Sequence, residues 1–328
     1  MTNLDALLLK AKHSENPEEL LQELRYAILA KGIPANSEGM SELRIYIWLI
    51  LLQIPPVPTS VYLDLIRQGA SPAHAKIQND TFRTFQGDPL FRRRVTQNSI
   101  TRVLNAVAWR LNDAHEARVN GWQSPPTLSE FGGSPDTSFM GRTTGTRTDA
   151  GGDAEQIGYV QGMNVLCGPF LYASRSEVEA FTGFERLITN ELPGYVRGSM
   201  EGVHKGLALV DRVLEVVDQK LYAHLMAHNM EAKIYAFASV LTMCACTPPL
   251  TEVLKLWDFL FAYGPHLNVL CIVAQLVLIR GEILESQSPN QILRNLPSLN
   301  AQKIIGVAMS FAGKIPEDMY AEIINHAK

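Results

Sequence analysis

The stretch NPEELLQELRYAILAKG, residues 16–32, has the marks of one complete amphipathic helix. Asn16 can cap the helix, Pro17 fills its first position, and Glu19 lies three residues after the cap. Leucine and isoleucine then recur three and four residues apart, and Gly32 ends the helix. The pattern predicts a helix at residues 16–32, and the apolar spacing of the other segments can be compared with that of this helix.

The same helical spacing of apolar residues recurs along most of the chain. Further segments of this kind are 41–52, 59–68, 97–111 and a long set that starts at Gln161. Few segments show the alternation of apolar and polar residues that is typical of strands. The sequence has no repeat with a fixed period of roughly 20 to 50 residues, which argues against a helical solenoid. We therefore predict an all-α fold.

One segment departs from this pattern. Residues 113–158 are rich in Gly, Ser, Thr, Asp and Pro, and they include Gly132-Gly133 and Gly151-Gly152. Their apolar side chains are too few to offset the entropy that is lost when a chain becomes ordered. We predict a disordered surface loop that is inserted into the helical domain.

Composition and charge narrow the classes of function. The chain has 328 residues, 46% of them apolar, and its 29 Lys and Arg against 33 Asp and Glu give a net charge of −4. Without a broad cationic field, binding to nucleic acid or to a membrane surface is disfavoured. The first residues lack the pattern of a secretory signal, and Gln275 interrupts the most apolar stretch, Leu267–Ile279. We expect a soluble, cytoplasmic protein without direct membrane insertion.

The cysteines and histidines form no recognisable metal motif. We interpret Cys244 and Cys246 as two buried thiols rather than a ligand pair. His224 and His228 share one helical face, but no acidic residue lies between them, so the zinc-protease motif is absent. We predict that the protein uses no metal and no other cofactor.

Two short sequences place an arginine in an unusual setting. In LRIYIWLILL, residues 43–52, Arg44 interrupts an apolar helix, where it would snorkel or pair with a carboxylate. In IQNDTFRT, residues 77–84, Asp80 and Arg83 lie three positions apart and can face each other on a helical turn. Taken alone, each arginine predicts a structural ion pair more readily than a functional site.

A third sequence, YVQGMN at 159–164, opens a helix directly after the predicted loop. Gly162 permits the close approach of another backbone, because it has no side chain. Gln161 can present its amide outward from the first turn. This motif, too, would be structural more often than functional if it stood alone.

Together and in this order, the three motifs resemble the signatures of the TBC domain, the family of GTPase-activating proteins that act mainly on Rab-type GTPases. They match its Arg-x-x-x-Trp helix, its Ile-x-x-Asp-x-x-Arg-Thr finger motif and its Tyr-x-Gln-Gly-Met motif at every defining position. Leu256-Trp257-Asp258, followed by Gly264, is similar to the family's C-terminal half. The resemblance extends from about Gly32 to the last helix and is interrupted only by the 113–158 insert. It implies a single multi-helix TBC domain at 32–328, preceded by an N-terminal helical segment at 1–31.

The resemblance implies a catalytic role in trans for two side chains. Arg83 would be the arginine finger that stabilises charge on the phosphate oxygens, and Gln161 would orient the attacking water. The implied supporting residues are Asp80, Arg44, Tyr159, Gly162 and Thr84. Asp80 would hold Arg83 ready for the partner's nucleotide, since a tethered side chain loses less entropy at the transition state.

The chain is compact, and the sequences of residues 44–48 and 248–259 are similar to those of the fungal checkpoint branch of this family. The resemblance to that branch implies the catalytic half of a two-component activator that restrains mitotic exit and septation. The implied partners are a GTP-bound small Ras/Rab-like GTPase and a scaffold subunit, at the spindle pole body of the cytoskeleton. The alternatives are a catalytically silent TBC adaptor, which would only tether a GTPase or a scaffold, and a general helical scaffold. The presence of both Arg83 and Gln161 favours the active form, which stimulates its partner and turns over no substrate of its own.

Overall fold

The structure, a computed structural model, describes residues 3–11, 16–55, 58–119 and 158–328. The regular structure in these ranges is helical and they contain no strand, so the all-α prediction is confirmed. Within the same ranges, no helix is both long and apolar enough to cross a bilayer.

The chain before the undescribed stretch at 120–157 contributes the first seven helices. They are α1 (Asn3–Ala11), α2 (Pro17–Lys31), α3 (Arg44–Leu51), α4 (Thr59–Arg67), α5 (His74–Thr81), α6 (Pro89–Arg94) and α7 (Gln97–Val119). The chain after that stretch begins with α8 (Met163–Ala173), α9 (Glu177–Arg186), a π-helical turn η1 (Leu187–Glu191), α10 (Pro193–Val196), α11 (Glu201–Val217), α12 (Gln219–Ala227), α13 (Ala232–Tyr235) and α14 (Phe237–Leu241). It ends with α15 (Leu250–Tyr263), a 3₁₀ turn η2 (Pro265–Leu267), α16 (Asn268–Leu278), α17 (Arg280–Glu285), α18 (Pro289–Arg294), α19 (Ala301–Ser310) and α20 (Glu317–Asn325).

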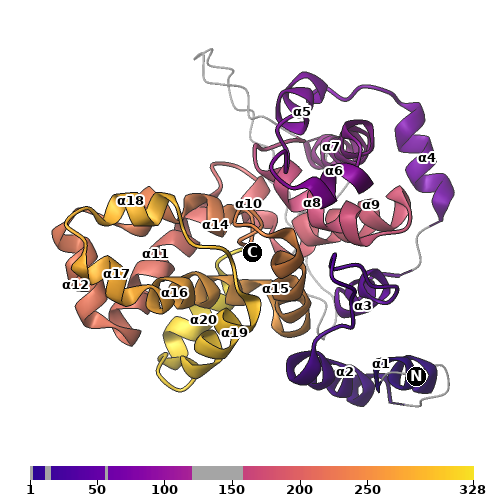
Figure 1. Cartoon of the computed structure of the whole chain (residues 1–328). Helices are drawn as coiled ribbons and strands as arrows, with labels where there is room; N and C mark the ends of the chain where they lie inside the picture. Colours follow the sequence, from indigo (N-terminus) through magenta and orange to yellow (C-terminus); the bar gives the residue numbers. More distant parts are fainter. Residues whose placement is uncertain (1–2, 12–15, 56–57, 120–157) are drawn as a thin grey trace, which may run out of the picture.

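The helices form two groups with α15 between them (Figure 1). Helices α4 to α9 lie on one side, and α11, α12 and α16 to α20 lie on the other. Helix α15 contacts α3 and α8 of the first half of the fold and α19 of the second. Helix α2 also packs against α15, so the predicted N-terminal segment 1–31 contacts the rest of the protein directly. The division at residue 32 stays a prediction.

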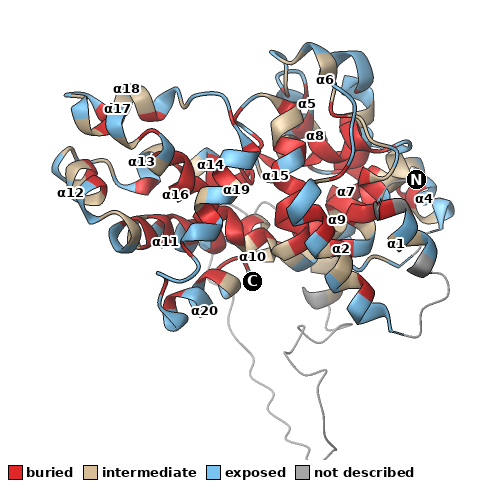
Figure 2. Cartoon of the chain, turned by 60° about the horizontal axis from the view of Figure 1, so that its bottom comes forward, coloured by how far each residue is buried: buried red, intermediate tan, exposed pale blue. Residues whose placement is uncertain are grey.

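An aromatic cluster fills the core where the two groups meet. Trp48 of α3, Phe170 of α8, and Trp257 and Phe261 of α15 are all buried, and their ring centroids lie 5.1 to 5.9 Å apart. Such edge-to-face, tilted and stacked contacts add to the stabilisation that apolar burial provides. Figure 2 shows buried residues concentrated along α7, α8 and α9. The cluster fixes α8, and the YVQGMN motif lies at the N-terminal end of that helix.

The predicted boundary between helix and loop after residue 111 is wrong. Helix α7 continues to Val119, so the first part of the predicted loop at 113–158 is helical. Ala, Glu and Arg in this part favour a helix, and the side chain of Asn112 donates a hydrogen bond of 2.8 Å to Glu116 one turn later. The rest of the predicted disordered loop, 120–157, lies outside the described residues.

Candidate functional site

Arg83 and Gln161 line one open cavity of about 720 Å³. The Arg83 side chain is 53% exposed, and Gln161 is exposed as well. The cavity is bounded by the turn after α5, the turn before α8, the loop between α10 and α11, and α14. Its apolar wall includes Phe85, Val165, Met200, Phe237 and Leu241. Two motifs that are distant in the sequence therefore present their polar side chains to one space.

The finger motif folds as the end of a helix. Helix α5 stops at Thr81, and the backbone N–H of Arg83 then donates to the carbonyl of Asp80 at 3.2 Å. The Arg83 Nε donates to Oδ1 of Asp80 at 3.1 Å, and Nη2 contacts the same oxygen. The Asp80 side chain is only 7% exposed, so a fixed, buried carboxylate holds a half-exposed guanidinium. The predicted pairing of Asp80 with Arg83 is confirmed.

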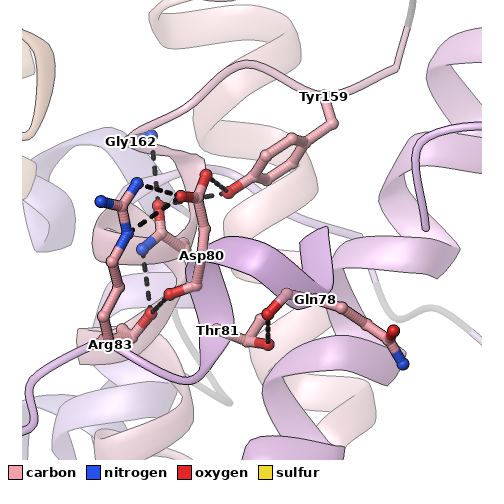
Figure 3. Close-up of polar contacts among 8 residues, drawn as sticks. Gln78, Asp80, Thr81, Arg83, Tyr159 and Gly162 are labelled. Carbon is pink, nitrogen blue, oxygen red and sulfur yellow. Dashed lines mark hydrogen bonds and ion pairs between the residues drawn. The ribbon is translucent and has the colours of Figure 1, made fainter. Parts of the chain in front are cut away.

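Tyr159 connects the glutamine motif to this ion pair. Its hydroxyl donates a hydrogen bond of 2.8 Å to Oδ2 of Asp80, the oxygen that Arg83 does not use. Burial, and then the hydrogen bond to Asp80, raise the pKa of Tyr159 above its usual value, so the phenol keeps the proton that it donates. Figure 3 shows Arg83 and Tyr159 converging on Asp80, whereas Gln78 points away from them.

Asn164 completes the network, although no role for it was predicted from the sequence. Its amide nitrogen donates to Oγ1 of Thr84 at 2.9 Å, and its Oδ1 accepts from the backbone N–H of Gly162 at 3.1 Å. Thr84 in turn donates to the backbone carbonyl of Asp80 at 3.0 Å. An Asn at the start of an apolar run was the available signal in the sequence, because an amide that such a helix buries requires hydrogen-bond partners. Asn164 thus links the two motifs, through the Thr84 hydroxyl of one and the Gly162 backbone N–H of the other.

Gly162 sets the direction of Gln161. Its φ of 108° lies in the left-handed region, and a Cβ at this position would come within 2.7 Å of Leu241 Cδ2. Only glycine fits both conditions. The helix consequently starts at Met163 and not at Gln161 as predicted, and Gln161 lies in the preceding turn, exposed at the cavity.

Arg44 lies outside this cavity. It is 1% exposed, and its Nε and Nη2 donate to the two carboxylate oxygens of Asp258 at 3.0 and 3.1 Å. The Trp48 indole donates to the same carboxylate at 2.8 Å. Of the two alternatives for Arg44, snorkelling or pairing with a carboxylate, the structure shows the pair. The pair links α3 to α15, so the structure places Arg44 in the core and not among the residues that line the cavity.

The interpretation of two buried thiols is wrong for one of them. Cys244 is buried, and burial raises its pKa, whereas Cys246 is exposed and lines the cavity. Helix α14 ends at Leu241, and Cys246 lies in the turn that follows, where its side chain is exposed. The rings of His224 and His228 lie 4.5 Å apart, and the described residues contain no group of three or more His, Cys, Asp or Glu that could hold a metal ion.

Comparisons with known proteins agree on one family. The model of the Rab-GTPase-TBC domain matches residues 153–284. The chain is 38% identical to Cell division control protein 16 of Schizosaccharomyces pombe, covering 97% of this chain and 92% of that protein. It is 34% identical to the mitotic check point protein BUB2 of Saccharomyces cerevisiae, covering 99% and 97%.

Solved structures show the same fold. The Ypt/Rab-GAP domain of Gyp1p superposes with a TM-score of 0.64 at 17% identity, covering 95% of this chain and 98% of that one. The Chlamydomonas flagellar RabGAP TBC domain superposes with a TM-score of 0.65 at 19% identity, covering 93% and 88%. At these identities the likeness concerns the arrangement of the helices.

Proposed function

The chain belongs to the Rab-GTPase-TBC family, and we therefore propose that it accelerates GTP hydrolysis by a small Ras/Rab-like GTPase. One observation carries the proposal: Arg83 and Gln161 are both exposed and line the same cavity. Hydrolysis of GTP requires an attacking water held in line and donors for the charge that develops on the phosphate oxygens. A guanidinium and a carboxamide on one surface supply both.

Arg83 is suited to the charge because part of its hydrogen-bonding capacity is uncommitted. Its Nε and Nη2 contact Asp80, which leaves Nη1 to donate to phosphate oxygens. A guanidinium stays protonated throughout the reaction. Because Asp80 already restrains the side chain, less conformational entropy is lost when Arg83 enters the nucleotide pocket of the partner.

Gln161 is suited to the water because a carboxamide donates and accepts hydrogen bonds at once. We expect Gln161→Ala to lower the maximal rate of stimulated hydrolysis on the order of 10²-fold or more, because the carboxamide that holds the attacking water in the transition state is lost. Gln78→Ala, which removes an exposed glutamine that points away from the Asp80 network, is the matched control and should retain the full rate. Single-turnover hydrolysis at saturating activator measures both. Equal rates for the two variants would contradict the role of Gln161.

Cys246 offers a direct test of docking. It is the exposed member of the four cysteines and lines the cavity, so a thiol-specific reagent should label it selectively. We expect the labelling to slow in proportion to the fraction of activator that is bound when the GTPase carries a non-hydrolysable GTP analogue. Labelling that stays fast while binding is shown by another method would place the GTPase on a different surface.

The hydrolysis and labelling assays also distinguish the active form from a catalytically silent adaptor. An adaptor would protect Cys246 without any change in the rate of hydrolysis. The active form requires protection and stimulation together. The presence of both Arg83 and Gln161 on one cavity favours the active form.

We also propose that this activity acts on mitotic exit and septation, with a scaffold subunit, in the cytoplasm and at the spindle pole body. The relatives named for cell division control and for a mitotic check point support the process. The scaffold and the location rest on the likeness of the sequence to the checkpoint branch. Stimulation assays with and without co-purified partners, together with imaging of the tagged chain through mitosis, test these proposals.

A further inference from the structure

The segment that carries the finger exposes two neighbouring side chains of opposite character. From Asp80 to Thr84, only Phe82 and Arg83 are exposed, and the flanking side chains are buried. Phe82 is 57% exposed. The segment therefore exposes one cation and one large apolar ring at consecutive positions of the chain, whose Cα atoms lie about 3.8 Å apart.

Phe82 stands apart from the other phenylalanines of the protein. Among those in the described ranges, the rest are buried or partly buried, and Phe82 alone is exposed. Nearby Phe85 packs against the core, but Phe82 does not. An exposed apolar ring is ordinary when it occurs alone. Here the exposed ring directly precedes, in the sequence, the arginine that is proposed to enter the partner.

The backbone holds Phe82 in a fixed turn. The N–H of Thr84 donates to the carbonyl of Thr81 at 3.3 Å, and the hydroxyl of Thr84 donates to the carbonyl of Asp80 at 3.0 Å. Asn164 holds Thr84 from α8. The ring is thus presented from a preformed segment, which reduces the entropy lost on binding. Aromatic side chains, phenylalanine included, are enriched in protein interfaces.

We propose that Phe82 is the apolar anchor by which the protein docks onto its GTPase, and that it enters an apolar recess beside the partner's nucleotide pocket. The inference rests on the proposed function, because it takes the occupant of the surface to be a GTPase. Since Arg83 must reach the phosphates, the recess for Phe82 lies at the edge of the same pocket. A partner that lacks an apolar recess there binds poorly, so Phe82 selects among GTPases while Arg83 acts on the one selected.

The test separates affinity from chemistry in the full chain. Phe82→Ala is expected to raise the KM for the GTP-loaded GTPase on the order of tenfold to a hundredfold, because a buried aromatic contact is lost, and to leave kcat unchanged. Phe82→Leu should recover much of the affinity, because it restores apolar volume. Tyr26→Ala is the matched control: Tyr26 is 72% exposed on α2, away from the cavity, and its loss should leave KM and kcat unchanged. Urea unfolding of each variant should match the wild type, because the side chains replaced are exposed.

Each outcome decides the inference. Stimulation with a normal KM in Phe82→Ala would overturn it and leave the proposed function standing. A lower kcat with a normal KM would also overturn it, because Phe82 would then act by positioning Arg83. Binding of the GTPase loaded with a non-hydrolysable analogue is compared between Arg83→Ala and Arg83→Ala/Phe82→Ala, where the anchor predicts weaker binding only in the double variant. Absence of binding and of stimulation in the wild type would overturn the proposed function and the inference together.

Discussion

Arg83→Ala is expected to lower the maximal rate of stimulated GTP hydrolysis by roughly 10³- to 10⁵-fold, the range over which an arginine finger in trans acts. The transition state would lose the donors that face the phosphate oxygens, whereas the ground-state complex would lose little. Single-turnover assays at saturating activator measure the rate, and binding to the GTPase with a non-hydrolysable analogue measures the complex. Weaker binding with an unchanged maximal rate would indicate that Arg83 serves affinity instead.

The chain offers a control for this experiment with the same local chemistry. Arg67 pairs with Asp64 three residues before it, with 2.6 Å between Nη1 and Oδ1, and its side chain is 73% exposed. This pair repeats the spacing of Asp80 and Arg83 on another helix, α4, outside the cavity. Arg67→Ala removes the same side chain and should leave stimulation unchanged. A matching loss in Arg67→Ala would mean that general changes in surface charge explain the effect.

Arg44→Ala is expected to destabilise the protein by about 3–5 kcal/mol, because it leaves the carboxylate of Asp258 buried without its cation. Asp258→Ala should cost a similar amount, because Arg44 is then the uncompensated charge. The double variant should cost less than the sum of the two, since neither charge then remains alone. Urea unfolding of the full chain measures all three free energies.

The control for this prediction is an exposed ion pair. Arg212 forms two hydrogen bonds of 2.5 and 2.9 Å to Glu322, and both side chains are about half exposed. Arg212→Ala should change the free energy of unfolding by less than about 1 kcal/mol, because exposed pairs contribute little. An Arg44→Ala variant as stable as Arg212→Ala would contradict the structural importance of the buried pair.

Local patterns in the sequence predicted local structure well. The capping of α2 is as expected: the side chain of Asn16 accepts from the N–H of Glu19 at 3.3 Å, and the N–H of Gly32 donates to the carbonyl of Ile28 at 2.8 Å. The Asp80 and Arg83 pair was also visible, because both residues lie within one turn. Interactions of this range depend on spacing alone.

Interactions between distant residues were not predictable in the same way. The sequence indicated that Arg44 needs a carboxylate, but spacing does not select Asp258 among 33 acidic residues. The hydrogen bonds of Tyr159 and Asn164 to the finger segment arise only when α8 packs beside α5. The family resemblance indicated which residues matter, whereas the tertiary packing determines how they are held.

The hydrogen bonds from Tyr159 and Asn164 to the finger segment also bear on evolution and engineering. Because the glutamine motif positions the finger segment, the substitutions that one motif tolerates depend on the residues present in the other. The two motifs should therefore evolve together. Transplanting the Asp80–Thr84 segment alone onto another helical scaffold would transfer the arginine without the side chains that restrain it. A functional graft needs both segments and the packing of the helices that carry them.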